Sequence, residues 1–302
     1  QVAVFSCANA VPLSRTYCLR MASDAETLRV VNPRDFYGRF LTEGIRPDGR
    51  PLLKWRKPSI TFRTISSADG SCSAKIGDTT VVCAINAEIT SPDFDVPNRG
   101  FMDINLNLSP LCSTSFEIGK PNELSLSVAA MISRVLQKSG SIRLEDLVVQ
   151  VGLNVWVLYV DAVCFNYDGN IVDATLLAVN GALADLKLPV PITTEPTYEV
   201  PIPKVDILRN EATCLSRSHT PMSLTFTIID GYLIADPNAE EELLGSSTIS
   251  IIVNEHDELC SVYKPGGALV SEDVIRQCIA ITKTRTIALR RTFNKSLLKQ
   301  AS

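Results

Sequence analysis

The stretch SITFRTISSADGSCSAKIGDTTVVCAINAEI, residues 59–89, decides the fold class of this chain. Apolar and polar side chains alternate along three segments within it, which is the pattern of half-buried strands. The pairs Asp69-Gly70 and Gly77-Asp78 separate the segments, and such pairs favour tight turns. The stretch therefore predicts an antiparallel meander.

Two helices are expected to pack on the sheet that this meander begins. Residues 123–138 carry apolar side chains at helical spacing, and residues 171–186 are rich in alanine and leucine. Further strands are predicted at residues 102–108, 147–151 and 155–165. Strands and helices that mix on one sheet indicate an α+β fold.

The second half of the chain repeats this order of elements. Strands are predicted at residues 223–229, 232–235, 247–253 and 259–263, and a long helix around residues 272–293 follows them. The repeat is visible in element order and hardly at all in residue identity. We therefore expect two similar α+β halves with mixed sheets packed against helices.

A proline-rich segment separates the two halves. Its five prolines are Pro189, Pro191, Pro196, Pro201 and Pro203. Because proline lacks a backbone donor, this segment is predicted to be an extended connector and not a core element. The predicted division is a disordered leader at 1–31, an N-terminal domain at 32–190, a connector at 191–215 and a C-terminal domain at 216–302.

The beginning of the chain allows two interpretations. Residues 1–20 contain Arg15 and Arg20 and no acid, which is compatible with a targeting segment. The alternative is a translated leader, because the residues from Met21 onward look like a native start and Gln1 does not.

A short amphipathic helix is expected after this leader. Asn32 and Pro33 suit its cap and its first position. Residues 45–51, with two prolines and a glycine, then form a turn-rich link to the first domain.

Composition limits the function classes. The 302 residues are 45% hydrophobic and 21% charged, the balance of a globular protein. A net charge of -4 argues against a stand-alone nucleic-acid binder, because such proteins neutralise phosphates with excess Lys and Arg. Any RNA contact must be local or shared with partners. No apolar run of about 18 residues occurs, so no membrane-spanning helix is expected.

The nine cysteines are scattered and form no CxxC pair, and only His219 and His256 could help to complete a metal site. They are interpreted as reduced thiols, which indicates the cytosol or nucleus. No metal and no cofactor is expected.

Two groups of acids are candidates for chemistry. Asp161, Asp168 and Asp173 cluster on a strand, a turn and a helix, and turn formation and the helix dipole are the preferred explanation of the last two. Asp236 begins the segment DPNAEEE, residues 236–242. We interpret that segment as a solvated helix start with Asp236 as its cap, because adjacent glutamates cannot converge on one ion.

One segment resembles a phosphate-binding loop. Residues 264–267, KPGG, precede a helix, but two glycines are a weak signal. No nucleophile and base form a motif and histidine is nearly absent, so a Ser/His or Cys/His hydrolase has little support.

Several strings together resemble the ribonuclease PH-like family. RPDGR at 46–50, ADGS at 68–71 and KIGDTTV at 75–81 are similar to the start of such domains. The later strings WVLYVD, YDGNIVDA, DP with EEE, and KPGG look like the branch that forms the ring of the eukaryotic RNA exosome. They occupy residues 156–161, 167–174, 236–242 and 264–267.

The resemblance implies the ribosomal-protein-S5-domain-2-like fold twice over, in a six-membered ring that threads RNA toward a separate nuclease. The implied partners are other ribonuclease PH-like ring subunits in a hetero-hexamer, S1/KH-type cap subunits and RNA. The implied location is the nucleus, including the nucleolus, and the cytoplasm.

Active members of the family are phosphorolytic, and an arginine pair and carboxylates hold the phosphate and assist the attack. The segment that matches the arginine pair, residues 116–125, contains Glu117, Lys120 and Glu123 here. Where the catalytic acids are expected, residues 189–195 begin the proline-rich connector. The resemblance therefore implies a degenerate site and no catalytic residue.

A ring member without catalysis still contacts RNA, and Arg99, Lys120 and Arg134 are the candidates for facing the channel. The alternative for each is an ordinary solvated charge. Arg46 and Arg50 are expected to fix the link or to bind a neighbour.

Three functions stay open at this point. The leading hypothesis is a non-catalytic exosome ring subunit that guides RNA to 3'-to-5' degradation and processing. The runner-up is a phosphate-dependent 3'-5' exoribonuclease, active alone or through a composite site with a neighbour. A small-molecule kinase or isomerase would need a longer phosphate loop.

Overall fold

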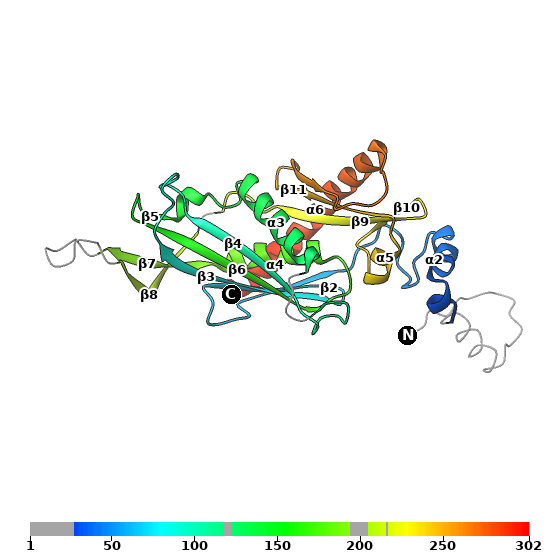
Figure 1. Cartoon of the computed structure of the whole chain (residues 1–302), viewed down its shortest axis with the longest axis horizontal. Helices are drawn as coiled ribbons and strands as arrows, with labels where there is room; N and C mark the ends of the chain where they lie inside the picture. The colour runs from blue at the N-terminus through cyan, green and yellow to red at the C-terminus, as the bar shows by residue number, and fades with distance from the viewer. Residues whose placement is uncertain (1–26, 118–121, 194–204, 216, 302) are drawn as a thin grey trace, which may run out of the picture.

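The computed structural model describes residues 27–117, 122–193, 205–215 and 217–301 (Figure 1). Helix α2 (Pro33–Thr42) begins as predicted, because the Asn32 side chain accepts the Asp35 amide and Pro33 occupies the first turn. Residues 27–31, the end of the predicted disordered leader, are helical, and Arg29 pairs with Glu240. That part of the leader prediction is wrong. Residues 1–26 lie outside the described part.

The first sheet is mixed and has the strand order β1-β2-β3-β6-β4. Its strands are β1 (Pro58–Phe62), β2 (Gly70–Ile76), β3 (Thr79–Thr90), β4 (Phe101–Leu108) and β6 (Asn154–Asn166), with β5 (Val148–Gln150) paired to β6. The first three form the predicted antiparallel meander, and β6 runs antiparallel to β3 and parallel to β4. Burial alternates along β3 and β4, so one face of the sheet is more buried than the other.

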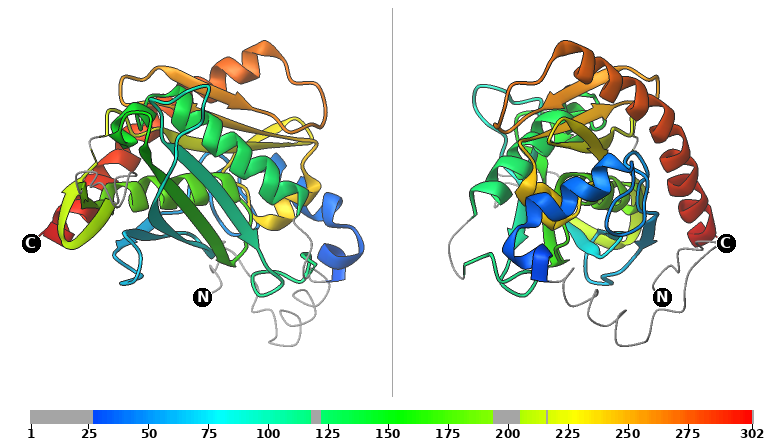
Figure 2. Two further views of the ribbon diagram at one scale, coloured as in Figure 1. Left: turned by 60° about the vertical axis from the view of Figure 1, so that its left-hand side comes forward. Right: turned by 90° about the vertical axis from the view of Figure 1, so that its right-hand side faces the viewer.

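Helices α3 (Glu123–Lys138) and α4 (Ile171–Asp185) cover the buried face (Figure 2). The two helices differ in burial. Helix α3 buries only one side, whereas every residue of α4 from Ile171 to Leu183 is buried. Helix α4 contacts β2 and β3 of the first sheet and also β9 of the second. Contact on both sides explains why its sequence is apolar all round.

The second sheet is antiparallel throughout and has the strand order β10-β9-β11-β12. Its strands are β9 (Met222–Ile229), β10 (Tyr232–Ala235), β11 (Ser247–Val253) and β12 (Leu259–Tyr263), and the short helix α5 (Ala239–Leu244) lies between β10 and β11.

The last helix, α6 (Glu272–Ala301), is longer than the sequence pattern predicted and packs on β9, β11 and β1. Its buried Phe293 meets Phe62 of β1 edge to face, with ring centroids 5.7 Å apart. Helix α6 therefore continues past residue 293, where the sequence pattern predicted its end, because its last turns pack on the first domain.

The predicted connector contains regular structure at both ends. Strand β7 (Lys187–Thr193) pairs antiparallel with β8 (Val205–Cys214), with a register shift between Pro189 and Val190. Prolines are tolerated because each strand of a two-stranded ribbon has an open edge. The domain boundaries remain predictions. Within the described residues, no helix is long and apolar enough to cross a membrane.

Candidate functional site

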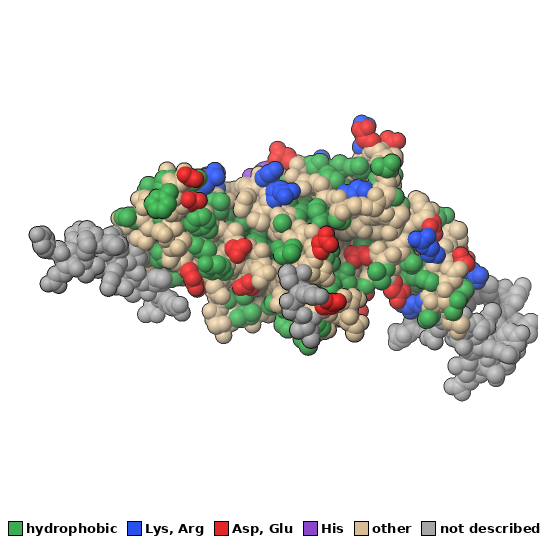
Figure 3. All heavy atoms as spheres, in the orientation of Figure 1, with side chains coloured by type: hydrophobic (Ala, Val, Ile, Leu, Met, Phe, Trp, Pro, Cys, Tyr) green, Lys and Arg blue, Asp and Glu red, His purple; other side chains and the backbone are tan. Residues whose placement is uncertain are grey.

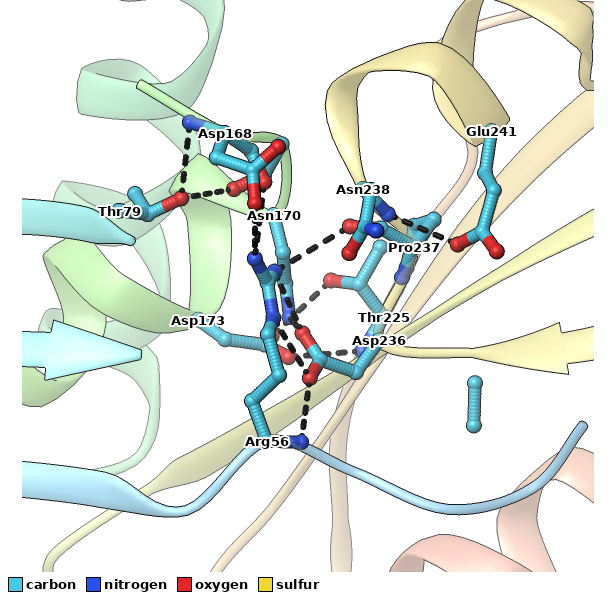
Figure 4. Close-up of polar contacts among 12 residues, drawn as sticks. Arg56, Thr79, Asp168, Asn170, Asp173, Thr225, Asp236, Pro237, Asn238 and Glu241 are labelled. Carbon is cyan, nitrogen blue, oxygen red and sulfur yellow. Dashed lines mark hydrogen bonds and ion pairs between the residues drawn. The ribbon is translucent and has the colours of Figure 1, made fainter. Parts of the chain in front are cut away.

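A cluster of charged side chains lies where the two domains meet (Figure 4). We call it the junction network. Its members are Arg46, Arg50, Arg56, Asp168, Asn170, Asp173, Thr225, Asp236, Glu241 and Glu242. They come from the link before β1, the turn before α4 and the first turn of α4, and the region from β9 to α5.

Arg56 is at the centre of the network. Its Nε and Nη2 atoms donate to the two carboxylate oxygens of Asp236 at 3.0 and 2.9 Å, and its backbone amide donates to the same carboxylate at 2.8 Å. Its Nη1 atom donates to Asp168 at 2.9 Å. A planar guanidinium suits this arrangement, because it presents several donors in a fixed fork. Arg56 thus joins Asp168 of the first domain to Asp236 of the second.

Asp236 is a buried anion whose charge is compensated. Its side chain is 1% exposed, and this burial alone would raise the pKa of its carboxyl group. Hydrogen bonds and positive charge from Arg56 outweigh burial, so the net pKa of Asp236 is lowered. Asp236 therefore stays ionised inside the junction.

The turn before α4 presents a second partner to Asp236. Asn170 adopts a left-handed conformation with φ of 54°, and its Nδ2 atom donates to Asp236 at 2.6 Å. Asparagine tolerates this conformation better than most residues. The Thr79 hydroxyl donates to the Gly169 carbonyl at 2.7 Å and accepts the Asp168 amide at 3.0 Å, which fixes the turn.

Arg46 anchors the link to the second domain. It is fully buried, ion-pairs with Glu241 at 3.3 Å, and donates to the carbonyls of Ala235 and Asp236. Arg50 donates to Asn238 at 2.8 Å. These contacts agree with the expected role of Arg46 and Arg50 in fixing the link.

The prediction of a solvated helix start at residues 236–242 is wrong. Asn238, and not Asp236, is the N-cap of α5, in a capping box with Glu241. Glu241 is 1% exposed, and Glu242 accepts hydrogen bonds from Tyr167 at 2.7 Å and from the Asn170 amide at 2.7 Å. Burial raises the pKa of both glutamates despite these partners. The acids turn inward because partners from the first domain compensate them.

Asp173 also bridges the domains. It lies in the first turn of α4, and its carboxylate accepts the Thr225 amide at 3.0 Å and the Thr225 hydroxyl at 2.9 Å. Burial raises the pKa of this carboxyl group. The network brings Asp168 and Asp173 together with Asp236, whereas Asp161 lies apart on β6, where Asn105 donates to it at 3.4 Å.

The chemistry that this arrangement supports is structural. Every carboxylate of the network accepts a hydrogen bond or ion pair from the protein itself. In the described ranges, no group of three or more His, Cys, Asp or Glu side chains could hold a metal ion.

The candidates for RNA contact lie outside the network. Arg99 lies in the loop before β4, is 57% exposed, and approaches Glu145 at 3.4 Å. Arg134 is exposed on α3. Lys120 falls outside the described residues. The structure places Arg99 and Arg134 on different elements and records no mutual contact among the residues it describes.

The glycine-rich segment before α6 is a closed turn. Lys264 Nζ donates to the carbonyls of Gly266 and Gly267 at 2.7 and 3.3 Å. Gly267 has φ of 84°, and a Cβ atom there would lie 2.4 Å from the Ser246 carbonyl oxygen. Close packing against β11 accounts for this glycine.

Sequence reasoning missed Arg56 and Tyr37. Arg56 lies in KWRK, residues 54–57, a basic run just before a strand, and that was the available signal. Tyr37 donates to Glu240 at 2.8 Å and ties α2 to α5. The helical spacing predicts only that Tyr37 lies on the apolar side of its helix, and does not predict its hydrogen bond to Glu240.

Two family models match the chain. The model of the 3' exoribonuclease family, domain 1, matches residues 54–189, and that of domain 2 matches residues 219–285. The chain belongs to the 3' exoribonuclease family. The resemblance to ribonuclease PH-like domains and the two-part α+β fold are thereby confirmed.

Relatives within the 3' exoribonuclease family are exosome components. The exosome complex component rrp43 of Schizosaccharomyces pombe is 31% identical over 255 residues, which are 84% of this chain and 93% of that protein. The exosome complex component Rrp42 of Thermococcus gammatolerans is 35% identical over 254 residues, 84% of this chain and 90% of that protein.

A solved structure is similar over nearly the same length. It is described as the Archaeoglobus fulgidus exosome with RNA bound to the active site. One of its chains matches with a TM-score of 0.76 and 31% identity, covering 86% of this chain and 97% of that one. The similarity therefore extends over nearly the whole of that chain.

Breaking the Arg56–Asp236 pair should cost much stability. We expect Arg56→Met to lower the free energy of unfolding by about 3–5 kcal/mol, because it leaves a buried carboxylate without its cation. A double-mutant cycle with Asp236→Asn, measured by urea denaturation of the full chain, should show a coupling of about 1–3 kcal/mol. Strict additivity of the two changes would contradict the pairing.

A matched control is Arg276→Met. Arg276 pairs with Glu272 at 2.7 Å, but the two side chains are 72% and 76% exposed. Arg276→Met should lower the free energy of unfolding by less than about 1 kcal/mol.

Asp236 should also make the free energy of unfolding depend on pH. Because its pKa is lower in the folded chain than in the unfolded one, its contribution is complete above the unfolded value of about 3.9. The contribution is lost as pH falls from there through the folded pKa. Other network acids have raised pKa values and act in the opposite sense.

The measurement is therefore the difference in unfolding free energy between the native chain and Asp236→Asn at several pH values from 6 downward. That difference should stay constant to about pH 4 and then shrink. A difference that does not change with pH would show that Asp236 is not held ionised.

Proposed function

We propose that this chain is a non-catalytic ring subunit of the RNA exosome, which helps to form the channel that guides RNA to 3'-to-5' degradation and processing. The observation that carries the proposal is the state of its acids. In a chain related to exosome components along most of its length, the carboxylates of Asp236, Glu241 and Glu242 bind groups of the protein itself, whereas Glu240 stays exposed. The hydrogen bonds and ion pairs of the first three hold the two domains together.

The segment that matches the family's arginine pair supports the same conclusion. Its residues include Glu117 and Glu123, and two anions would oppose a phosphate and an RNA end. Phe116 in this segment is buried and meets Tyr167 edge to face at 5.3 Å between ring centroids. An aromatic contact ties the beginning of the segment to the turn that carries Asp168.

The proposed partners are the other ribonuclease PH-like ring subunits, S1/KH-type cap subunits and RNA. The archaeal complex with a similar chain is described as holding RNA in its active site. Arg99, Lys120 and Arg134 are the residues that we propose contact RNA. Nucleus, nucleolus and cytoplasm are the proposed locations.

The decisive experiment is RNA decay with and without inorganic phosphate. The purified chain alone should release no nucleoside diphosphate, and the chain assembled with its ring partners should bind and protect RNA. Nucleoside diphosphate release by the chain alone would overturn the proposal and favour a phosphate-dependent exoribonuclease. Release that needs one neighbour and is lost on mutation of this chain would indicate a composite site.

The RNA-contact residues are tested in the assembled complex. Arg99→Glu and Arg134→Glu should each weaken RNA binding by about three- to ten-fold at fixed low salt, because each removes a phosphate contact and adds a repulsive charge. Lys283→Glu is the control, since Lys283 is an exposed cation on α6. An effect no larger than that of the control would remove these residues from the channel.

A further inference from the structure

The face of the first sheet that α3 and α4 leave uncovered has an unusual composition. Three aromatic side chains on it are substantially exposed: Phe101 by 38%, Tyr159 by 40% and Phe165 by 50%. A solvated face of a sheet normally carries polar side chains. Aromatic residues on such a face are typical of protein interfaces. We call the exposed side of β3, β6 and β4 the outer face.

The register brings acids between these aromatic residues. Asp103 of β4 pairs with Tyr159 of β6, and Asp161 lies two residues further along β6, on the same side. Phe101 and Glu88 both pair with Val157, from opposite neighbours. Side chains directly across from each other or on the diagonal of one face lie within contact range. Aromatic rings and carboxylates therefore form one continuous surface.

Cations are absent from the strands that carry these carboxylates. The sequences of β3, β4 and β6 contain no Lys, Arg or His. Within the described residues, Glu88 and Asp103 make no ion pair, and Asp161 accepts only the weak hydrogen bond from Asn105 at 3.4 Å. This arrangement contrasts with the junction network, where every acid is compensated.

The space-filling view agrees with this description. Over the region of β3 and β6, Figure 3 shows hydrophobic and acidic side chains, whereas the Lys and Arg side chains lie near the upper edge of the view and around α2. An RNA backbone would be repelled here, since phosphates need Lys and Arg. A protein surface that carries Arg or Lys between apolar side chains is complementary in both charge and hydrophobicity.

We propose that the outer face docks a protein partner that presents basic side chains between apolar ones. The inference rests on the proposed function in one respect, namely that the partner is sought among the components of the assembled complex. Phe101, Tyr159 and Phe165 supply apolar area, and Glu88, Asp103 and Asp161 orient the partner's cations.

The test is binding of the full chain to its purified, preassembled partners by fluorescence titration at low salt. Asp103→Lys should weaken binding by about ten-fold or more, and Asp103→Lys with Asp161→Lys by more still, because like charges then oppose each other. The matched control is Glu43→Lys, which makes the same charge change at an exposed position at the end of α2. It should bind as the native chain does.

A second measurement uses the native chain, so its outcome does not depend on whether a variant folds. Carbodiimide labelling should modify Glu88, Asp103 and Asp161 in the isolated chain, and assembly should protect all three. Protection by RNA alone, without protein partners, would overturn the inference. So would full labelling in the assembled complex.

The outcomes separate the two proposals. If the native chain assembles but the Asp103 and Asp161 variants assemble equally well, only the docking inference fails. If the native chain does not join the complex at all, the proposed function fails with it.

Discussion

The buried contact between Arg56 and Asp236 is the interaction on which the arrangement of the two domains depends. Asp236 is almost inaccessible, and an ionised carboxylate in that position is tolerated only with a cation and further donors around it. Arg56 supplies the cation from the first domain and also reaches Asp168. Because the link residues Arg46 and Arg50 bind the same region, the path of the chain into the first domain is fixed by the second.

This use of the acids constrains function. A general acid or a metal ligand needs a carboxylate that is free to bind the reacting group, whereas the acids of the junction are already bound to the protein. In the described structure these acids hold the two domains together. The proposal of a non-catalytic subunit, which contributes shape and charge to the assembly, builds on this use of the acids.

Charge is distributed unevenly over the molecule. The overall charge of -4 is too acidic for a chain that binds RNA along its whole surface. Candidate RNA contacts are confined to a few cations such as Arg99 and Arg134, while the outer face of the first sheet gathers acids and aromatic rings without Lys or Arg. The two proposals together assign RNA contact to those cations and protein contact to the outer face.

The sequence by itself determined most strands and helices of both domains, because alternation in residues 59–89 and helical spacing in residues 123–138 are local patterns that burial on one face imposes. Its family strings also determined the fold. Only the tertiary structure decided that Asp236 and Glu241 face inward, that Arg56 is the partner of Asp236, and that α6 extends to Ala301 along the first domain. The physical reason is distance along the chain. Arg56 and Asp236 are 180 residues apart, so their pairing depends on how the two domains pack, which no local pattern records.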